Sequence, residues 1–377
     1  MQPDLARKLR FSVGKARRPL RAAFFLQQNA RAVAGDVRRR AAYCRVLGSP
    51  LYGRLLDRVA EDVEAAGPCW AVLRDHHGEL TGYKLSLRLL GSVHRLVLDS
   101  RAPELARFYP SCGGVAERDG LFEAFVATVE ANVQELRSLV RRPIQTNEVA
   151  RSAALFGGFL QFAQETGRPL RLLELGASAG LNLRWDQYRY DCGRLGWGNP
   201  TSPVRLQWHE GSPPLGIHPT IVERTGSDLQ PIDPCTSEGK LSLMSYIWPD
   251  QVPRMDRLRA ALSIAPKVPA PIEEADALEW LEGKLQTREP DVATVVFHSL
   301  FTQQLSRLKR RQLYDAVVGA GGKATTSSPF AWLQMERGGK GRAFVRLISW
   351  PGGHMRLIAR ATLHGDRVSW GDRSKAS

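Results

Sequence analysis

After Gly167, the sequence alternates short runs of apolar residues with stretches of helical periodicity. Short apolar runs between turn signals are typical of buried strands, and strands that alternate with helices form a parallel sheet covered on both faces. A last pair of runs flanks Pro351-Gly352-Gly353 and predicts an antiparallel hairpin. The alternation predicts an α/β fold with strands over residues 170–175, 221–227, 270–275, 292–297, 330–335, 344–350 and 354–363, and helices over 255–264, 277–285 and 305–318.

The first half of the chain follows a helical pattern instead. Ser49 and Pro50 are typical of a helix start, with the serine as N-cap and the proline at the first helical position. The apolar residues between 121 and 140 predict one long amphipathic helix, and a further helix is expected to end at Gly167. We therefore divide the chain into a basic arm over residues 1–37, a helical N-terminal domain over 38–144 and an α/β domain over 145–377.

The net charge of +15 is concentrated near the N-terminus. Residues 1–40 hold eleven basic side chains and two acidic ones, a local charge of +9 that leaves +6 for the rest of the chain. Such an arm is usually a solvated tail, and its composition also resembles an organelle transit peptide. If it binds anything, we expect a weak contact with nucleic acid or another anionic surface.

The remaining composition excludes several classes of protein. No run approaches the roughly 18 to 20 unbroken apolar residues that a membrane span needs, so no transmembrane segment is expected. The five cysteines are scattered and contain no C-x-x-C pair, which argues against a zinc site and a disulfide framework. We expect no metal and a cytoplasmic location.

The segment Arg171-Leu-Leu-Glu-Leu-Gly-Ala-Ser-Ala-Gly-Leu-Asn182 leads from a strand through small residues into a helix. Small residues let the backbone approach a ligand, and the free N–H groups of a helix start favour a polar or anionic group there. Three kinds of site use this geometry. The dinucleotide fingerprint G-x-G-x-x-G is broken at Ser178 and Leu181, which argues against NAD.

The serine hydrolase elbow G-x-S-x-G matches at Gly176-Ala177-Ser178-Ala179-Gly180, with Ser178 as the nucleophile. An aspartate together with His354 or His364 would complete a triad in the chain order of that fold. Hydrolases of this type need several strands before the elbow, whereas the preceding residues have helical periodicity. No HGGG-like oxyanion segment precedes the elbow either.

The third pattern is the E/D-x-G-x-G-x-G loop of S-adenosylmethionine-dependent methyltransferases. Its predicted cofactor-binding residues are Glu174, Gly176, Ala177, Ser178, Gly180 and Asn182, with Ser178 in place of the middle glycine. Glu174 has an alternative interpretation, as a strand-end acid that pairs with an arginine.

Later strand ends add polar groups to the same predicted site. Asp228 and Leu229 end the second strand in a G-x-D-x-x-P-like segment, where an acid can accept the ribose hydroxyls. The separation of 52 residues from the loop exceeds the usual ~20, and we attribute the excess to an insertion over residues 189–216. Asp276 and Ala277 end the third strand, where methyltransferases face the adenine amino group. Asp228 alternatively forms an Asx-turn, and Asp276 alternatively caps a helix.

The fourth strand ends at His298 and Ser299, the candidate catalytic base and its assistant. His298 alternatively is a core histidine with a satisfied hydrogen bond. Further polar or aromatic groups are candidates for a lid or for substrate contact, and these are Gln145, Asn147, Glu148, Arg151, Trp248 and Asp250. The alternatives there are helix capping, a local Glu148–Arg151 ion pair and core packing of Trp248.

The chain resembles a bacterial family known as domain of unknown function 2332 from about Arg38 onward. The resemblance rests on Gly48-Ser-Pro-Leu-Tyr52, His94-Arg-Leu-Val-Leu98, Gln145-Thr-Asn-Glu148 with Arg151-Ser152, Glu174-Leu-Gly-Ala-Ser-Ala-Gly-Leu-Asn182, Trp248-Pro-Asp-Gln251, Phe297-His-Ser299 and His364-Gly365. It implies a Rossmann-like, methyltransferase-type core, but no established reaction. Two departures are the basic arm and Gln303-Gln304, where relatives are expected to carry an aromatic residue.

These observations favour a Rossmann-like methyltransferase-type sheet, mostly parallel with a C-terminal antiparallel hairpin, preceded by an α-helical N-terminal domain. The expected function is an S-adenosylmethionine-dependent methyltransferase. Phe297-His298-Ser299 stands where methyltransferases of nucleobase amino groups carry N-P-P-Y or D-P-P-Y, so small-molecule or protein substrates are favoured. The alternatives are a non-catalytic ligand-binding protein with the same core and a serine hydrolase that uses Ser178.

Overall fold

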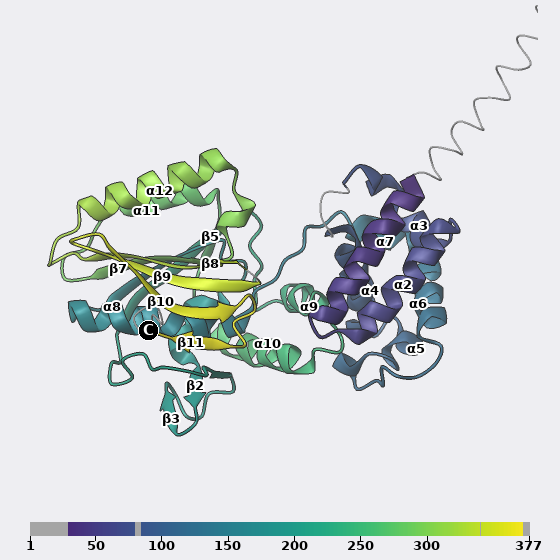
Figure 1. Cartoon of the computed structure of the whole chain (residues 1–377), viewed down its shortest axis with the longest axis horizontal. Coiled ribbons are helices and arrows are strands. Elements are labelled where there is room, and N and C mark those ends of the chain that lie inside the picture. Colours follow the sequence, from purple (N-terminus) through teal and green to yellow (C-terminus); the bar gives the residue numbers. More distant parts are fainter. Residues whose placement is uncertain (1–28, 80–83, 340, 372–377) are drawn as a thin grey trace, which may run out of the picture. The chain divides into compact units, whose positions relative to one another are not determined.

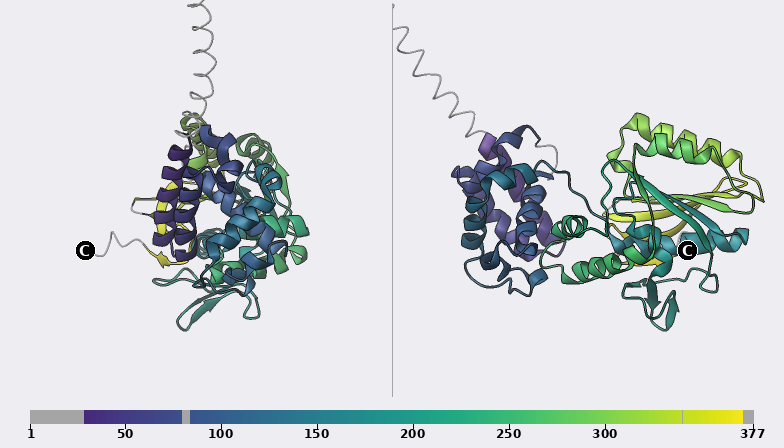
Figure 2. Two further views of the ribbon diagram at one scale, coloured as in Figure 1. Left: turned by 90° about the vertical axis from the view of Figure 1, so that its right-hand side faces the viewer. Right: turned by 180° about the vertical axis from the view of Figure 1, so that it is seen from behind.

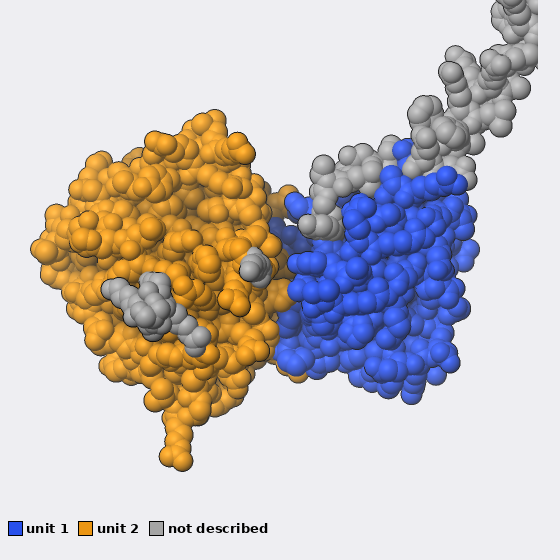
Figure 3. Space-filling view, in the orientation of Figure 1, with its two compact units in different colours: residues 1–145, 241–255 blue, residues 146–240, 256–377 orange. Residues whose placement is uncertain are grey.

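The computed structural model describes residues 29–79, 84–339 and 341–371. The chain divides into two compact units (Figures 1 and 3), a helical unit of residues 1–145 and 241–255 and a sheet unit of residues 146–240 and 256–377. Two of the unit boundaries lie inside the helices α9 (Ser237–Ser245) and α10 (Val252–Ile264). None of the helices in the described part of the chain is long and apolar enough to cross a membrane.

The helical unit begins earlier than the sequence predicts. Residues 29–46 form a helix, and Val33 and Val37 lie buried in the core, so part of the predicted arm belongs to this unit. The rest of the arm, residues 1–28, lies outside the described residues. The helices that follow are α2 (Pro50–Glu64), α3 (Pro68–Leu73), α4 (Lys84–Leu98), α5 (Pro103–Ala106), α6 (Leu121–Ala131) and α7 (Val133–Leu139).

Two of these helices test predicted boundaries. Helix α2 begins as expected, because the Ser49 hydroxyl accepts a hydrogen bond from Tyr52 N at 3.3 Å. The long helix predicted over residues 121–140 is wrong, since the chain breaks between α6 and α7 at Asn132. The Asn132 amide donates to the Thr128 carbonyl at 2.8 Å, and such local bonds compete with helix propagation.

Residues 241–255 join the helical unit through contacts with residues far away in sequence. Trp248 is buried in the core of this unit, with its ring 6.3 Å from that of Tyr52. The Asp250 carboxylate accepts hydrogen bonds from the Ser49 hydroxyl at 2.6 Å and from Leu51 N at 3.0 Å. Asp250 therefore stabilises the start of α2 and not the helix that follows it, and Trp248 packs in a core.

The sheet unit contains one large, mostly parallel sheet with an antiparallel end. Its strand order is β11-β10-β9-β8-β7-β1-β5-β6, in which β6, β5, β1, β7 and β8 run parallel. The predicted hairpin is confirmed as the antiparallel pair β9 and β10. The strands are β1 (Leu170–Leu175), β5 (Ile221–Asp228), β6 (Ile272–Glu274), β7 (Ala293–Ser299), β8 (Phe330–Arg337), β9 (Arg342–Trp350), β10 (His354–Thr362) and β11 (Val368–Trp370).

Helices cover both faces of this sheet (Figures 1 and 2). On one face, α11 (Ala277–Leu285) and α12 (Arg307–Gly322) pack against apolar side chains of β1, β7, β8 and β9. On the other face lies α8 (Ser152–Thr166), where a Cβ on Gly158 would lie 2.5 Å from Leu333. Gly167 ends α8 with a φ of +63°, as the sequence predicts.

A second, small sheet lies within the predicted insertion. Its strands are β2 (Arg189–Cys192), β3 (Leu195–Trp197) and β4 (Arg205–Gln207), in the order β3-β2-β4. The chain after β4 runs beside the last strand of the large sheet. Trp370 N donates to the Glu210 carbonyl and His209 N donates to the Val368 carbonyl, both at 2.8 Å.

Candidate functional site

The order of the large sheet reverses at β1. The chain leaves β1 and forms β5 and β6 on one side of it, then β7 and β8 on the other. The carboxyl ends of β1, β5 and β7 therefore meet where consecutive connections go in opposite directions. In open α/β sheets ligands bind at such a point.

The turn that follows β1 requires small residues. Gly176, Ser178 and Gly180 have φ values of +66°, +54° and +64°, in the left-handed region. A Cβ on Gly176 would lie 2.5 Å from the ring of Phe301, which follows β7. The sequence pattern at residues 176–180, called the glycine turn below, is thus explained by backbone conformation and by close contact with the next strand end.

The end of β5 holds the glycine turn in place. The Ser178 amide donates to the Asp228 carboxylate at 2.9 Å, and the Ala177 amide donates to the Ser227 carbonyl at 3.0 Å. The other oxygen of Asp228 accepts from Gln230 N at 2.9 Å, which is the Asx-turn considered from the sequence. The neighbouring Leu229 side chain is 68% exposed.

Glu174, the last acid of β1, is 2% exposed, and its Oε2 has no hydrogen-bond partner in the described structure. Burial raises the pKa of Glu174 well above its ordinary value. The positive charges of Arg184 and Arg151 and a hydrogen bond with Asn182 offset this in part, whereas the Asp228 carboxylate adds to it. The result is a buried carboxyl group that holds its proton more tightly than an exposed glutamate does.

Arg184 is a site residue that the sequence interpretation missed. Its side chain is buried and donates to the carbonyl of Gly180 at 2.8 Å and to that of Val268 at 2.8 Å. It lies in a 3₁₀ segment, η4 (Leu181–Gln187), where a regular α-helix was expected. Its position one helical turn after Gly180 is the signal that could have identified it.

Part of the polar segment before α8 lies beside the same strand ends. The Asn147 side chain accepts from Leu181 N at 2.8 Å, directly after the glycine turn. Arg151 donates to the Ser299 hydroxyl at 3.4 Å, at the end of β7. The Glu148 carboxylate accepts from Ala150 N at 3.4 Å, which is the capping role considered from the sequence. Gln145 belongs to the helical unit.

Ser152 and Asn182 link α8 to the residues after the glycine turn. The Ser152 hydroxyl donates to the Asn182 side-chain oxygen at 2.8 Å, and both side chains are buried. Asn182 also bonds Glu174, so these two predicted cofactor-binding residues form one hydrogen-bonded set with Ser152. The Ser178–Asp228 and Leu181–Asn147 bonds lie in and directly after the glycine turn, beside this set.

His298 lies on the other face of the sheet from Glu174. Glu174 pairs with Phe297 in the β1–β7 register, and side chains alternate along a strand, so His298 points toward the α12 side. His298 is fully buried, its Nδ1 lies 2.8 Å from Glu336 Oε1, and its Nε2 has no hydrogen-bond partner in the described structure. The structure brings Ser299, but not His298, to the face that carries Glu174.

Glu336 of β8 is a second residue that the sequence interpretation missed. Its Oε1 accepts from Phe301 N at 2.9 Å and from Thr302 N at 3.0 Å, in addition to His298. Burial alone would raise the pKa of Glu336, but these hydrogen bonds and the charge of His298 lower it to about 2. Glu336 therefore fixes the loop whose Phe301 packs against Gly176.

Asp276 and Ala277 lie at the start of α11, beyond β6. One carboxylate oxygen of Asp276 accepts from Leu278 N at 3.0 Å, and the other accepts from the Lys309 ammonium at 2.5 Å. This is the helix-capping arrangement considered from the sequence. The Ala275 amide donates to the Asp228 carbonyl at 3.1 Å, so this segment adjoins the end of β5.

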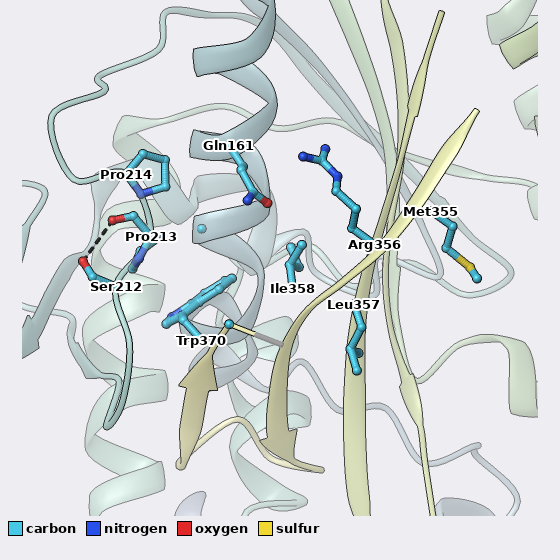
Figure 4. A pocket seen from close by; sticks show the side chains of 11 residues that line it. Gln161, Ser212, Pro213, Pro214, Met355, Arg356, Leu357, Ile358 and Trp370 are labelled. Atoms are coloured by element: carbon cyan, nitrogen blue, oxygen red, sulfur yellow. Dashed lines mark hydrogen bonds between the residues drawn. The ribbon is translucent and has the colours of Figure 1, made fainter. Parts of the chain in front are cut away.

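Two cavities of the sheet unit lie outside this cluster. One of about 500 Å³ lies between α8, residues 212–214 and the β10 and β11 strands (Figure 4). Arg356 and Ile358 point from β10 toward α8, with Trp370 beside them (Figure 4). The other, of about 360 Å³, is lined by residues 221–225 of β5 and by charged residues that include Lys284. Neither includes the glycine turn.

These features define an α/β protein whose central parallel strand leads into a glycine turn at a topological switch point. The chain belongs to the bacterial family of domain of unknown function 2332, described as "Uncharacterized protein conserved in bacteria", whose model matches residues 34–370. The resemblance noted in the sequence is thereby confirmed, and the residues before 34 lie outside the match. No curated protein and no solved structure matches the chain.

Proposed function

We propose that the sheet unit binds S-adenosylmethionine at the glycine turn and transfers its methyl group to an acceptor. The observation that carries the proposal is the position of Asp228. Its carboxylate, at the end of β5, lies 2.9 Å from the amide of Ser178 in the turn after β1. In nucleotide-binding α/β folds an acid at the end of this strand accepts the ribose hydroxyls, and the turn after the first strand lies beside the rest of the nucleotide.

The side chains present fit this cofactor. Glu174 offers a buried oxygen without a hydrogen-bond partner in the described structure, which suits a donor such as an ammonium group. Each Asp228 oxygen accepts one hydrogen bond from a backbone amide, and a carboxylate oxygen has room for a second donor. The exposed Leu229 side chain offers an apolar surface for a planar base. Asp276 fits less well, because its carboxylate already pairs with the Lys309 ammonium, whereas the two Asp228 bonds come from backbone amides.

The cofactor supplies an electrophilic methyl group, so the protein's task is orientation and exclusion of water. Asp228 and Leu229 would hold the nucleoside of the cofactor, and Glu174 would hold the amino group of its methionine part. Ser299, at the end of β7, and Arg151, which donates to the Ser299 hydroxyl, would face the methyl acceptor. His298 and Glu336 would position Phe301 against the glycine turn, because His298 is buried on the opposite face of the sheet.

Calorimetry with S-adenosylmethionine tests the proposal. Leu229→Ser is the sharpest variant, because the side chain is 68% exposed and its loss should leave the fold intact. We expect binding to weaken at least about fivefold, from the loss of roughly 1 kcal/mol of apolar contact. Val222→Ser is the matched control, since Val222 lies on β5, the strand that Leu229 follows, and is 51% exposed. Absence of binding by the folded protein, or equal losses in both variants, contradicts the proposal.

The second candidate function is a serine hydrolase, and one observation favours it. Ser178 is a non-glycine residue with a φ of +54° within G-x-S-x-G, and a strained serine after a strand is typical of a nucleophile elbow. A fluorophosphonate probe tests it. Labelling that is lost in Ser178→Ala, together with no response to S-adenosylmethionine, would favour the hydrolase. Binding of S-adenosylmethionine without turnover on any acceptor would favour a non-catalytic binding protein.

A further inference from the structure

A second basic region lies at the other end of the chain from the arm. Residues 301–371 contain twelve basic and three acidic side chains, a net charge of +9 that equals the charge of residues 1–40. The sequence interpretation assigned the positive charge mainly to the arm, and this count corrects it. All of residues 301–371 belong to the sheet unit.

Six arginines of this region have no acidic partner within salt-bridge distance among the described residues, and five of them lie on α12, β8 and β9. Elsewhere in the region, Arg311 pairs with Asp315, and Arg356 pairs with Glu165. Charges that lack an internal partner on a surface are available to an external one. The five are Arg307 and Arg310 at the start of α12, Arg337 at the end of β8, and Arg342 and Arg346 on β9.

The contacts of the sheet place these arginines at one end of it. Arg337 donates to the Gln303 side chain at 3.3 Å, and Gln303 lies a few residues before α12. In the β8–β9 register, Arg337 pairs with Ala343 and Gln334 pairs with Arg346. This end holds the carboxyl termini of β7 and β8, so it is also the end of the sheet that carries the glycine turn.

An aromatic ring lies among the arginines. The guanidinium carbons of Arg346 and Arg360 lie 5.4 Å and 6.0 Å from the centroid of the Phe344 ring. Arg342 is exposed, and Phe344 and Arg346 are half-buried, so this end of the strand is accessible to solvent. Side chains alternate along a strand, so Arg337 points to the other face of the sheet. We call Arg307, Arg310, Arg342, Phe344 and Arg346 the arginine–aromatic surface.

We infer that the arginine–aromatic surface binds single-stranded nucleic acid. Arginines bind phosphates along a strand, and aromatic or guanidinium planes stack on unpaired bases, a combination typical of single-strand binding on open sheet faces. A duplex hides its bases from such a platform, and an acidic protein has no bases to stack. The inference concerns binding alone and does not rest on the proposed function, because Arg346 lies on the face of the sheet that carries His298, opposite Glu174.

Fluorescence anisotropy of the full chain without cofactor tests the inference, with labelled RNA and DNA single strands and a duplex of equal length. We expect Arg342→Gln/Arg346→Gln to weaken single-strand binding at least about tenfold and to reduce the slope of log Kd against log salt by about 1.4, at roughly 0.7 per phosphate contact. The control Arg118→Gln/Arg194→Gln removes the same charge from exposed positions elsewhere and should change the affinity less than about twofold.

Phe344→Leu separates base stacking from general attraction of polyanions. We expect it to weaken single-strand binding at least about fivefold while the salt slope stays unchanged, because stacking involves no counterion release. Equal losses in the patch and control variants, tighter binding of the duplex, or full competition by polyglutamate would each overturn the inference. Because no S-adenosylmethionine is present, these outcomes are independent of the calorimetric test, and melting temperatures of all variants check the fold.

Discussion

Glu174 combines two properties that rarely occur together in a carboxyl group. It is buried at the end of the central strand, and one of its oxygens has no hydrogen-bond partner in the described structure. Burial raises its pKa, so the folded state holds a proton that the unfolded state releases above a pH of about 4.3. The stability of the protein therefore decreases as the pH rises from there toward the folded-state pKa.

Glu174→Gln removes this titration. We expect the variant and the wild type to have equal free energies of unfolding near pH 4, and the variant to have the larger free energy of unfolding at pH 8. The difference should grow by at most about 1.4 kcal/mol per pH unit. Urea unfolding at the two pH values measures it. Glu282→Gln, at an exposed position of α11, is the control without an expected effect. A wild-type stability that rises with pH relative to Glu174→Gln would contradict the assignment.

Glu336 changes the stability of the protein with pH in the opposite direction from Glu174. Its pKa in the folded state is lowered to about 2, so the stabilisation is complete above the unfolded value of about 4.3 and is lost as the pH falls toward 2. We expect Glu336→Gln to lower the free energy of unfolding by about 3 kcal/mol at pH 7 and by much less near pH 3. Denaturant titrations at both pH values decide this, and an equal loss at both would instead indicate a packing defect.

At the scale of elements, the glycine turn couples β1 to the loop after β7. Ala at 176 would adopt a left-handed backbone and place its Cβ 2.5 Å from Phe301, and Ala at 180 would place it 2.8 Å from Ile272. We expect Gly176→Ala and Gly180→Ala each to cost at least about 2 kcal/mol. Gly283→Ala is the control, since this helical position has open space and should gain about 0.5–1 kcal/mol. Thermal unfolding compares the three.

Some elements could be predicted to the residue because local signals determine them. β1 has the predicted bounds of Leu170–Leu175, and α11 has the predicted bounds of Ala277–Leu285. β11 was not predicted, because its three residues carry too little periodicity. The small sheet was not predicted either; within the insertion only the Gly, Pro and aromatic content was evident, and β2 pairs in parallel with β4 across a loop.

The candidate site could be predicted only in part. The strand-end residues Glu174 and Asp228 were found, because the carboxyl ends of parallel strands carry the polar positions of an α/β sheet. Because side chains alternate along a strand, the face of the sheet toward which His298 points can be deduced, but only once the β1–β7 register is known. Glu336 and Arg184 act through hydrogen bonds to backbone groups. Those of Glu336 leave no pattern in the sequence, whereas the spacing of Arg184 from Gly180 is a signal that the sequence interpretation did not use.

At the scale of the whole molecule, two separate segments build the helical unit. Residues 241–255 supply Trp248 to its core and the carboxylate of Asp250 to α2, and the Pro249 carbonyl accepts from Ser111 N at 2.9 Å. These partners are up to about 200 residues apart in sequence, which explains why the sequence interpretation placed the segment in the α/β domain.

Excision tests this organisation. We expect residues 1–145 alone to lack a cooperative unfolding transition, because the fragment leaves the Trp248 site empty and α2 without the Asp250 contact, a loss of several kcal/mol. A version with residues 241–255 joined by a flexible linker should regain the transition. Circular dichroism during heating measures both. Cooperative unfolding of the short fragment at the temperature of the helical unit in the full chain would show that the segment is dispensable.

The hydrogen bonds between residues 209–210 and β11 have a consequence for the behaviour of the chain in concentrated solution. The final strand of a sheet presents backbone groups that can recruit the same strand of another copy. Here the Glu210 carbonyl and the His209 amide occupy two of those groups on Trp370 and Val368. The insertion thereby ends the growth of the sheet at the β11 edge and protects this edge against edge-to-edge aggregation.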